Sequence, residues 1–104
     1  MEIINVHPDI RKFIKLLDYE TKAYIDKIIA VLAFYEHRLA MPYSKKIEKN
    51  LYELRIKASK NIRIFYTFYN NKVFLLHIIN KEKQKLSPKD IDTARKRLAY
   101  LHFR

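Results

Sequence analysis

The sequence at residues 51–79 reads LYELRIKASKNIRIFYTFYNNKVFLLHII. In residues 51–57 apolar side chains alternate with charged ones, which is typical of a β-strand with one buried face. Residues 62–69 and 73–79 are rich in β-branched and aromatic residues, so they predict two further strands. A tight hairpin is expected at Asn70 and Asn71, because asparagine tolerates the positive φ angles that such turns need. The segment therefore predicts three consecutive antiparallel strands.

Four charged residues share one face of this predicted sheet. Glu53, Arg55 and Lys57 alternate with the apolar residues of the first strand, and Arg63 has the corresponding place in the second. Since successive side chains point to opposite faces of a sheet, these residues are expected on the side away from the core. The pattern predicts three cations and one carboxylate on one face of the sheet, which is either concave or solvent-facing.

Helical patterns lie on both sides of the strands. Apolar residues in 10–17 recur at the spacing of a short amphipathic helix, and a second helix is expected from Asp18 to about His37. Ser87 followed by Pro88 is typical of a helix start, so a third helix is predicted there.

The expected fold is a single α+β domain over residues 1–104. The two N-terminal helices should form an antiparallel hairpin, packed on a small twisted antiparallel sheet of three to four strands and followed by a C-terminal helix. Residues 38–50 are interpreted as a connecting loop, and residues 2–7 could supply an edge strand.

Composition narrows the possible classes of protein. The chain has no cysteine, which removes disulfides, thiolate catalysis and the common structural zinc sites. Its histidines are scattered, and His77 is interpreted as a buried structural residue, so we expect neither a metal nor a cofactor. The sequence has neither a signal-peptide pattern nor an apolar run of roughly 20 residues, and we therefore expect a cytoplasmic protein.

The charge of the chain is strongly positive and unevenly distributed. The formal net charge is +11, and residues 51–104 hold thirteen Lys and Arg against four Asp and Glu. Such a surface attracts polyanions, with an affinity that falls as salt rises. A basic surface that is merely solvated would give the same composition.

Several short segments, in this order and at these spacings, resemble the HigB-type branch of the RelE/ParE toxin superfamily, including its phage-derived members. They are Leu51-Tyr52-Glu53-Leu54-Arg55, Arg63-Ile64-Phe65-Tyr66, Leu75-Leu76-His77, Lys81-Glu82-Lys83-Gln84-Lys85, Ser87-Pro88 and Ile91-Asp92-Thr93-Ala94-Arg95. Pro42 and Lys46, before the first strand, also fit that branch. The resemblance covers nearly the whole chain and implies a RelE-like fold.

The resemblance also implies a function, that of the toxin in a type II toxin–antitoxin system. Such a toxin is a ribosome-dependent endoribonuclease, or mRNA interferase, and its partners are mRNA, the ribosome and a cognate antitoxin of helix-turn-helix type. The implied cleavage is metal-free: the ribose 2′-hydroxyl attacks the adjacent phosphate. This chemistry needs a base, an acid, and fixed positive charge on the phosphorane oxygens.

The charged strand residues are the candidates for catalysis. Arg63 matches the place of a phosphate-stabilising arginine, and a guanidinium can bind two phosphate oxygens at once. Arg55 and Lys57 could share that stabilisation, or a lysine with a lowered pKa could be the base. Glu53 is a second possible base. Each could instead be structural, since Glu53 would pair readily with Arg55 or Arg63.

Further residues are expected to bind RNA or to reach the site. The lysines expected to contact the RNA backbone are Lys46, Lys81, Lys83 and Lys85. Relatives usually have two adjacent lysines where this chain has Lys81 and Glu82. Tyr100 and His102 could reach the site from the end of the last helix.

Two other functions remain compatible with the sequence. A ParE-like inhibitor of DNA gyrase would have the same fold and a similar charge, and fold alone does not separate the two. A non-catalytic RNA-binding prophage protein is the third possibility, which the acidic Glu82 keeps open. The cationic sheet face and the lysines after the third strand favour the nuclease.

Overall fold

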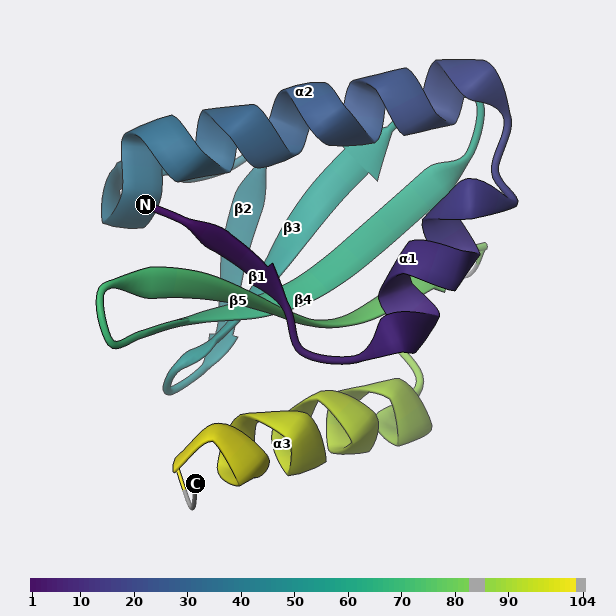
Figure 1. Ribbon diagram of the computed structural model, residues 1–104. Coiled ribbons are helices and arrows are strands. Elements are labelled where there is room, and N and C mark those ends of the chain that lie inside the picture. The colour runs from purple at the N-terminus through teal and green to yellow at the C-terminus, as the bar shows by residue number, and fades with distance from the viewer. Residues whose placement is uncertain (83–85, 103–104) are drawn as a thin grey trace.

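A computed structural model of the protein describes residues 1–82 and 86–102 (Figure 1). In chain order its elements are β1 (Ile3–Asn5), α1 (Pro8–Lys15), α2 (Tyr19–Tyr35), the 3-10 turn η1 (Glu36–Arg38), β2 (Ser44–Glu48), β3 (Leu51–Lys57), β4 (Asn61–Tyr69), β5 (Lys72–Asn80) and α3 (Pro88–His102). The architecture is α+β, with three helices and one five-stranded mixed sheet.

The strands follow the order β1-β5-β4-β3-β2 across the sheet. From β2 to β5 each strand pairs antiparallel with the next, whereas β1 pairs parallel with β5. The β4–β5 hairpin turns at Asn70 and Asn71, whose φ angles are 54° and 63°. The predicted three-stranded meander and its asparagine turn are confirmed.

Two parts of the predicted sheet were wrong. Residues 38–50 are not simply a loop, because Ser44–Glu48 forms the edge strand β2 beside β3. The sheet is also mixed rather than antiparallel, because the edge strand expected within residues 2–7 pairs with β5 in parallel. In both cases a short strand gains its backbone hydrogen bonds from a neighbour that its own sequence does not specify.

The predicted N-terminal helical hairpin is also corrected. Both helices form, and Asp18 caps α2 by accepting a hydrogen bond from the backbone N–H of Thr21 at 3.0 Å. However, α1 packs against β1 and β5, while α2 lies over β3 (Figure 1). Each helix buries its apolar side on a different part of the sheet, so the two are not packed as a pair.

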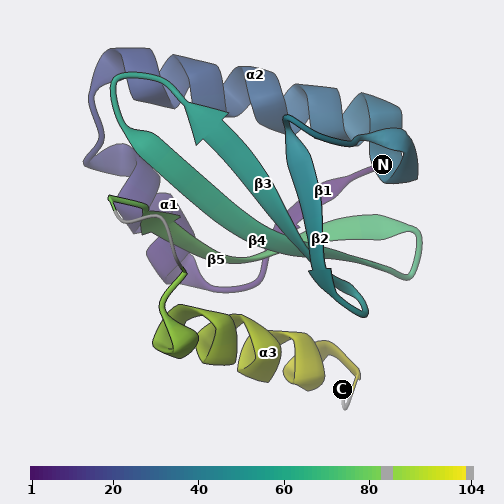
Figure 2. The same cartoon turned by 180° about the vertical axis from the view of Figure 1, so that it is seen from behind.

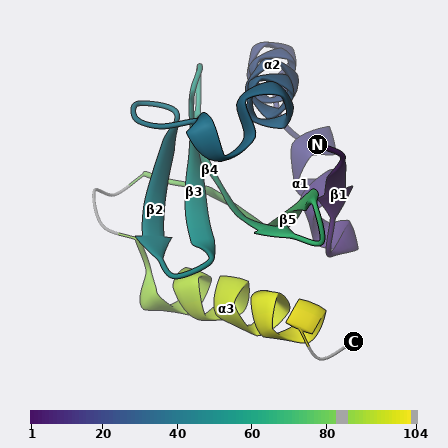
Figure 3. The same ribbon diagram turned by 90° about the vertical axis from the view of Figure 1, so that its left-hand side faces the viewer.

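Apolar cores lie on both faces of the sheet. One joins α1 and α2 to the sheet and includes Ile10, Ile25, Leu54 and Leu75. The other lies beneath α3 and includes Phe65, Leu76, Ala94 and Leu101. Figure 3 shows α2 and α3 at opposite ends of this layered arrangement. Because α3 covers part of the second face, that face is not simply exposed to solvent.

Charged pairs fix α3 in place. Asp90 pairs with His77 of β5 at 2.9 Å, Arg95 with Glu48 of β2 at 2.7 Å, and Arg97 with Asp9 of α1 at 2.7 Å. Pro88 is the first helical residue, and the Ser87 hydroxyl accepts a hydrogen bond from the backbone N–H of Lys89. The predicted start of the third helix is confirmed. Within the described residues, no helix combines the length and apolar character needed to cross a membrane.

Candidate functional site

A cleft of about 440 Å³ lies on the sheet face that α3 partly covers. Its walls come from β2, β3, the chain after β5 and the start of α3, through Lys45, Lys46, Ile47, Glu53, Arg55, Lys81, Leu86 and Ile91. Four of these residues are cationic and one is acidic. The cleft therefore combines an apolar side with a strongly positive rim.

Glu53 lies at the centre of a buried charge cluster beside this cleft. Its Oε1 atom is 3.4 Å from Nε of Arg63 and 3.5 Å from Nε of Arg55. The strand register explains the arrangement, because Arg55 lies directly opposite Arg63 and Glu53 is one side-chain row away. Like charges in opposed strand positions repel, and the carboxylate between them offsets that repulsion.

The two arginines of this cluster have different environments. Arg55 lines the cleft, whereas only 2% of Arg63 is exposed. The Arg63 guanidinium is turned inward, with Nη1 donating to the backbone oxygen of Ile62 at 3.2 Å and approaching the Asn61 side-chain oxygen at 3.4 Å. A concave or solvent-facing side was expected for these residues; Glu53 and Arg55 line the concave cleft, whereas Arg63 is almost completely buried.

Burial shapes the electrostatics of the cluster. It lowers the pKa of Arg63, while nearby Glu53 acts in the opposite direction and Arg55 lowers it further. The guanidinium nevertheless stays protonated in any accessible pH range. The Nε atoms of Arg55 and Arg63 are both buried without a hydrogen-bond acceptor within the described part of the chain. The cluster is thus held by charge more than by well-directed hydrogen bonds.

Lys81 follows β5 directly and faces the same cleft. Its backbone N–H donates to the oxygen of Asn61 at 2.7 Å, which continues the pairing of β5 with β4. Burial lowers the pKa of Lys81, and the positive charges of Arg63, Arg55 and Lys45 lower it further, against an opposing effect of Glu53. A lowered pKa increases the fraction of neutral amine, the form that can accept a proton.

Several predicted site residues do not line the cleft. Lys57 lines another hollow, with Tyr24 and Lys27 of α2. Tyr100 and His102 belong to the last turn of α3, and the His102 ring packs edge-on against Tyr69. The cleft is instead lined by the beginning of that helix. Lys83 and Lys85 lie outside the residues that the structure describes.

Sequence reasoning selected Lys46 but missed its neighbour Lys45. Both line the cleft, and Lys45 lies directly opposite Glu53 in the β2–β3 pairing. The alternation rule could have found Lys45 if residues 44–48 had been recognised as a strand, since it has the parity that places it on the Glu53 face.

His77, which was expected to be a buried structural residue, is partly buried, and its Nδ1 atom has no hydrogen-bond partner among the described residues. Its Nε2 atom lies 2.9 Å from an Asp90 carboxylate oxygen, and its ring stacks on Phe65. This pair joins β5 to the first turn of α3. In residues 1–82 and 86–102, no three His, Asp or Glu side chains are grouped so that they could hold a metal ion.

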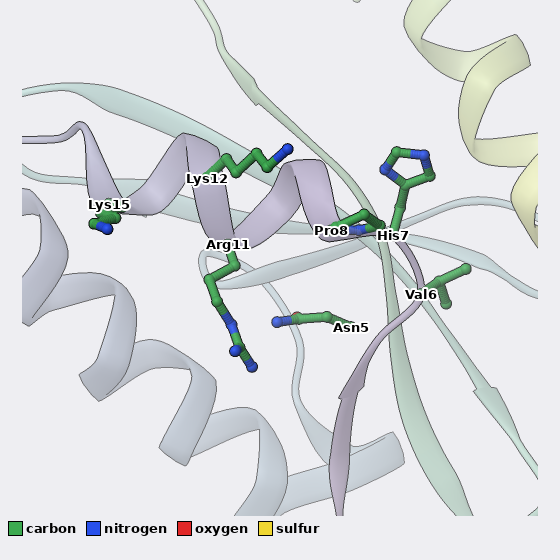
Figure 4. Close-up of a pocket in the computed structure, with 7 residues that line it drawn as sticks. All are labelled: Asn5, Val6, His7, Pro8, Arg11, Lys12 and Lys15. Atoms are coloured by element: carbon green, nitrogen blue, oxygen red, sulfur yellow. The ribbon is translucent and has the colours of Figure 1, made fainter.

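A second hollow lies at the opposite edge of the sheet, between β1 and the start of α1 (Figure 4). Arg11, Lys12 and Lys15 line it, together with Asn5 and His7. Figure 4 shows the three cations projecting from α1 in different directions, so they do not converge on one point. They add positive charge to this edge without forming a defined binding site.

The family model described as phage-derived protein Gp49-like (DUF891) matches residues 12–99. The chain belongs to this family. The Gp49-like family is part of the RelE/toxin-like group, and the match includes all of β2 to β5 and every cleft residue named above. A search of curated protein sequences found no match. The cleft of this Gp49-like chain therefore lies within the part of the sequence that defines its family.

Proposed function

We propose that this Gp49-like chain is the toxin of a type II toxin–antitoxin pair and acts as a ribosome-dependent endoribonuclease. The observation that carries the proposal is the cleft, where Lys45, Lys46, Arg55 and Lys81 surround a space next to the carboxylate of Glu53. The cations around this cleft suit a phosphodiester backbone. The lowered pKa of Lys81 suits it to accept a proton during cleavage of that backbone. Membership in a RelE/toxin-like family supports the same function.

The residues have separate roles in the proposed reaction. Arg55 is the guanidinium at the cleft surface, and it binds the phosphate that is attacked. Arg63 is a positioning residue, because it is buried behind Glu53 and acts through that carboxylate. Lys45 and Lys46 bind the RNA backbone on the β2 side of the cleft.

Lys81 is the proposed general base. Its neutral amine takes the proton from the ribose 2′-hydroxyl, and the resulting oxygen attacks the adjacent phosphorus. The bond from phosphorus to the 5′-oxygen then breaks, which leaves a 2′,3′-cyclic phosphate and a free 5′-hydroxyl once a proton has been delivered to the leaving oxygen. Arg55 stabilises the additional negative charge on the phosphorane.

The proposal includes partners and a location. Cleavage takes place on mRNA in the ribosome, in the cytoplasm, and a cognate antitoxin holds the toxin inactive. A basic toxin surface favours an acidic element in that antitoxin, because complementary charge speeds association and excludes other partners.

Primer extension on a reporter mRNA in a cell-free translation reaction tests the nuclease activity. The wild-type protein should produce cuts only when ribosomes are present, and Arg55→Ala and Lys81→Ala should each reduce them at least a hundredfold. Lys12→Ala, on the exposed surface of α1, is the matched control and should cut like the wild type. Arg63→Ala is less informative alone, since loss of a buried residue also affects folding.

Intact mRNA and unimpaired translation with folded wild-type protein would refute the nuclease function. A supercoiling assay with DNA gyrase would then test the ParE-like alternative. Ribosome or RNA binding without cuts would instead point to the non-catalytic RNA-binding alternative.

A further inference from the structure

The side of α2 that faces the β2–β3 edge of the sheet carries a long apolar groove. Two hollows of about 420 Å³ and 560 Å³ share Tyr24 and Lys27, and together they form what we call the α2 groove. Figure 2 shows α2 running above the end of β3 and the start of β2. The proposed nuclease cleft is on the other face of the sheet and does not account for this groove.

The groove follows the helix over its length. Glu20, Tyr24, Lys27, Val31 and Tyr35 line it at intervals of three or four residues, which places them on one side of α2. A helix of this length extends for about 25 Å. The side of a helix of that length matches a partner helix of about 16 residues lying alongside α2.

Large apolar side chains remain exposed in and around the groove. The exposed fraction is 86% for Tyr19 and 56% for Met41, and Tyr35 and Tyr43 are each more than 40% exposed. All four line the groove. Apolar groups that are grouped along one groove, rather than scattered singly, are typical of an interaction surface.

The positively charged residues of the α2 groove indicate that its partner is acidic. Lys27, Arg38 and Lys57 line it, and none of the three forms an ion pair within the described residues. Lys27 lies over the ring of Tyr24, and Arg38 lies over the ring of Tyr35, each at 5.8 Å from the centroid. Both cations are therefore held at the groove walls.

We infer that the α2 groove binds an amphipathic helix of a protein partner, with an apolar stripe against α2 and acidic residues beside Lys27, Arg38 and Lys57. The aliphatic lining from Ile28, Val31 and Leu39 suits leucine-type side chains better than nucleobases.

The groove and the nuclease cleft meet at Met41. This residue lines the groove, and its Sδ atom lies 3.6 Å from Nη1 of Arg55, which lines the cleft. A helix seated in the groove would thus contact a neighbour of the phosphate-binding arginine without filling the cleft. If the proposed function holds, the partner helix belongs to the antitoxin. This identification of the partner rests on the proposed function, whereas the proposal that the groove binds an acidic helix does not.

The absence of cysteine allows a direct test with the full-length protein. Ala23→Cys places a single thiol in the groove, and Ala99→Cys places one on the exposed surface of α3 as a matched control. Each is labelled with bimane and titrated with a synthetic helical peptide of about 16 residues, carrying a leucine stripe and glutamate elsewhere. Fluorescence should change at position 23 and not at position 99, without ribosomes or RNA.

Two comparisons make the test specific. A peptide with glutamine in place of glutamate should bind at least about tenfold more weakly at low salt. The double variant Lys27→Glu/Arg38→Glu should also weaken binding of the acidic peptide about tenfold, whereas Lys12→Glu/Lys15→Glu, with the same change in net charge on α1, should leave it within twofold.

The outcomes distinguish this proposal from the proposed function. Equal binding of the two peptides, an equal response at position 99, or an unchanged affinity of Lys27→Glu/Arg38→Glu would overturn it. A change of bimane fluorescence with protein concentration alone would identify a second copy of the chain as the occupant of the groove. A stronger fluorescence response to single-stranded RNA than to the acidic peptide would identify RNA as the occupant. None of these readouts depends on nuclease activity.

Discussion

Replacement of Glu53 by glutamine should destabilise the protein sharply, because it leaves the Arg63 guanidinium buried without a counter-ion. Only 3% of Glu53 is exposed, and Arg63 is buried to a similar degree. Removing one partner of a buried ion pair costs about 3–5 kcal/mol. The distances of 3.4 and 3.5 Å and the unbonded Nε atoms place this pair near the lower limit, at about 3 kcal/mol.

Urea unfolding followed by circular dichroism measures this loss. In thermal unfolding of a chain of this size, a loss of about 3 kcal/mol corresponds to a Tm decrease of roughly 12–24 °C. The double variant Glu53→Gln/Arg63→Met removes both charges and should be more stable than Glu53→Gln alone. Glu82→Gln, at an exposed position, is the control and should change stability by less than about 0.5 kcal/mol. A Glu53→Gln variant as stable as this control, or a double variant whose losses simply add, would refute the coupling of the two residues.

Three further predictions follow from charged residues elsewhere in the fold. A hydrogen bond from the Ser59 hydroxyl is the largest cause that lowers the pKa of Asp18 from 3.8 to about 2. The stability that Asp18 contributes is therefore present above pH 4 and lost as the pH falls towards 2. In the Asp18→Asn variant, the urea concentration at the unfolding midpoint should depend less on pH across this range. If Lys81 is the base, the single-turnover cleavage rate should rise with pH and level off below the pH at which an ordinary lysine titrates. Lys81→Arg should abolish this rise of the rate with pH. An unchanged pH profile in the variant would exclude Lys81 as the base. Arg97→Ala removes the 2.7 Å ion pair with Asp9 and should lower the free energy of unfolding in urea by about 1–2 kcal/mol; no loss would mean that this pair does not help to hold α3.

The central strands could be predicted because their sequence specifies them locally. Residues 52–57 alternate strictly between apolar and charged side chains, and Asn70-Asn71 supplies the positive φ angles of the hairpin. Two edge strands were harder to predict for opposite reasons. Residues 44–48 are short and polar, while residues 3–5 acquire their register from a partner about seventy positions further along the chain.

The candidate site was predicted in part. Glu53, Arg55 and Lys81 are brought together as the alternation of β3 and the position after β5 suggested. Burial of Arg63 could not be predicted, because the strand pattern places it on a face of the sheet but does not determine what packs over that face. The place of Lys57 depends in the same way on the course of α2, which forms a hollow around the end of β3.

One apolar core is formed by segments that lie far apart in the sequence, and this affects how the protein folds during translation. The apolar side of α2 belongs to the same core as Leu54, Ile64 and Leu75, which are translated after the helix is complete. At 5–20 residues per second, the roughly 40 residues from the end of α2 to the middle of β5 take about 2–8 s to synthesise. Throughout that interval the nascent chain carries an uncovered amphipathic helix, so translation speed over β3 to β5 sets its exposure to chaperones and to aggregation.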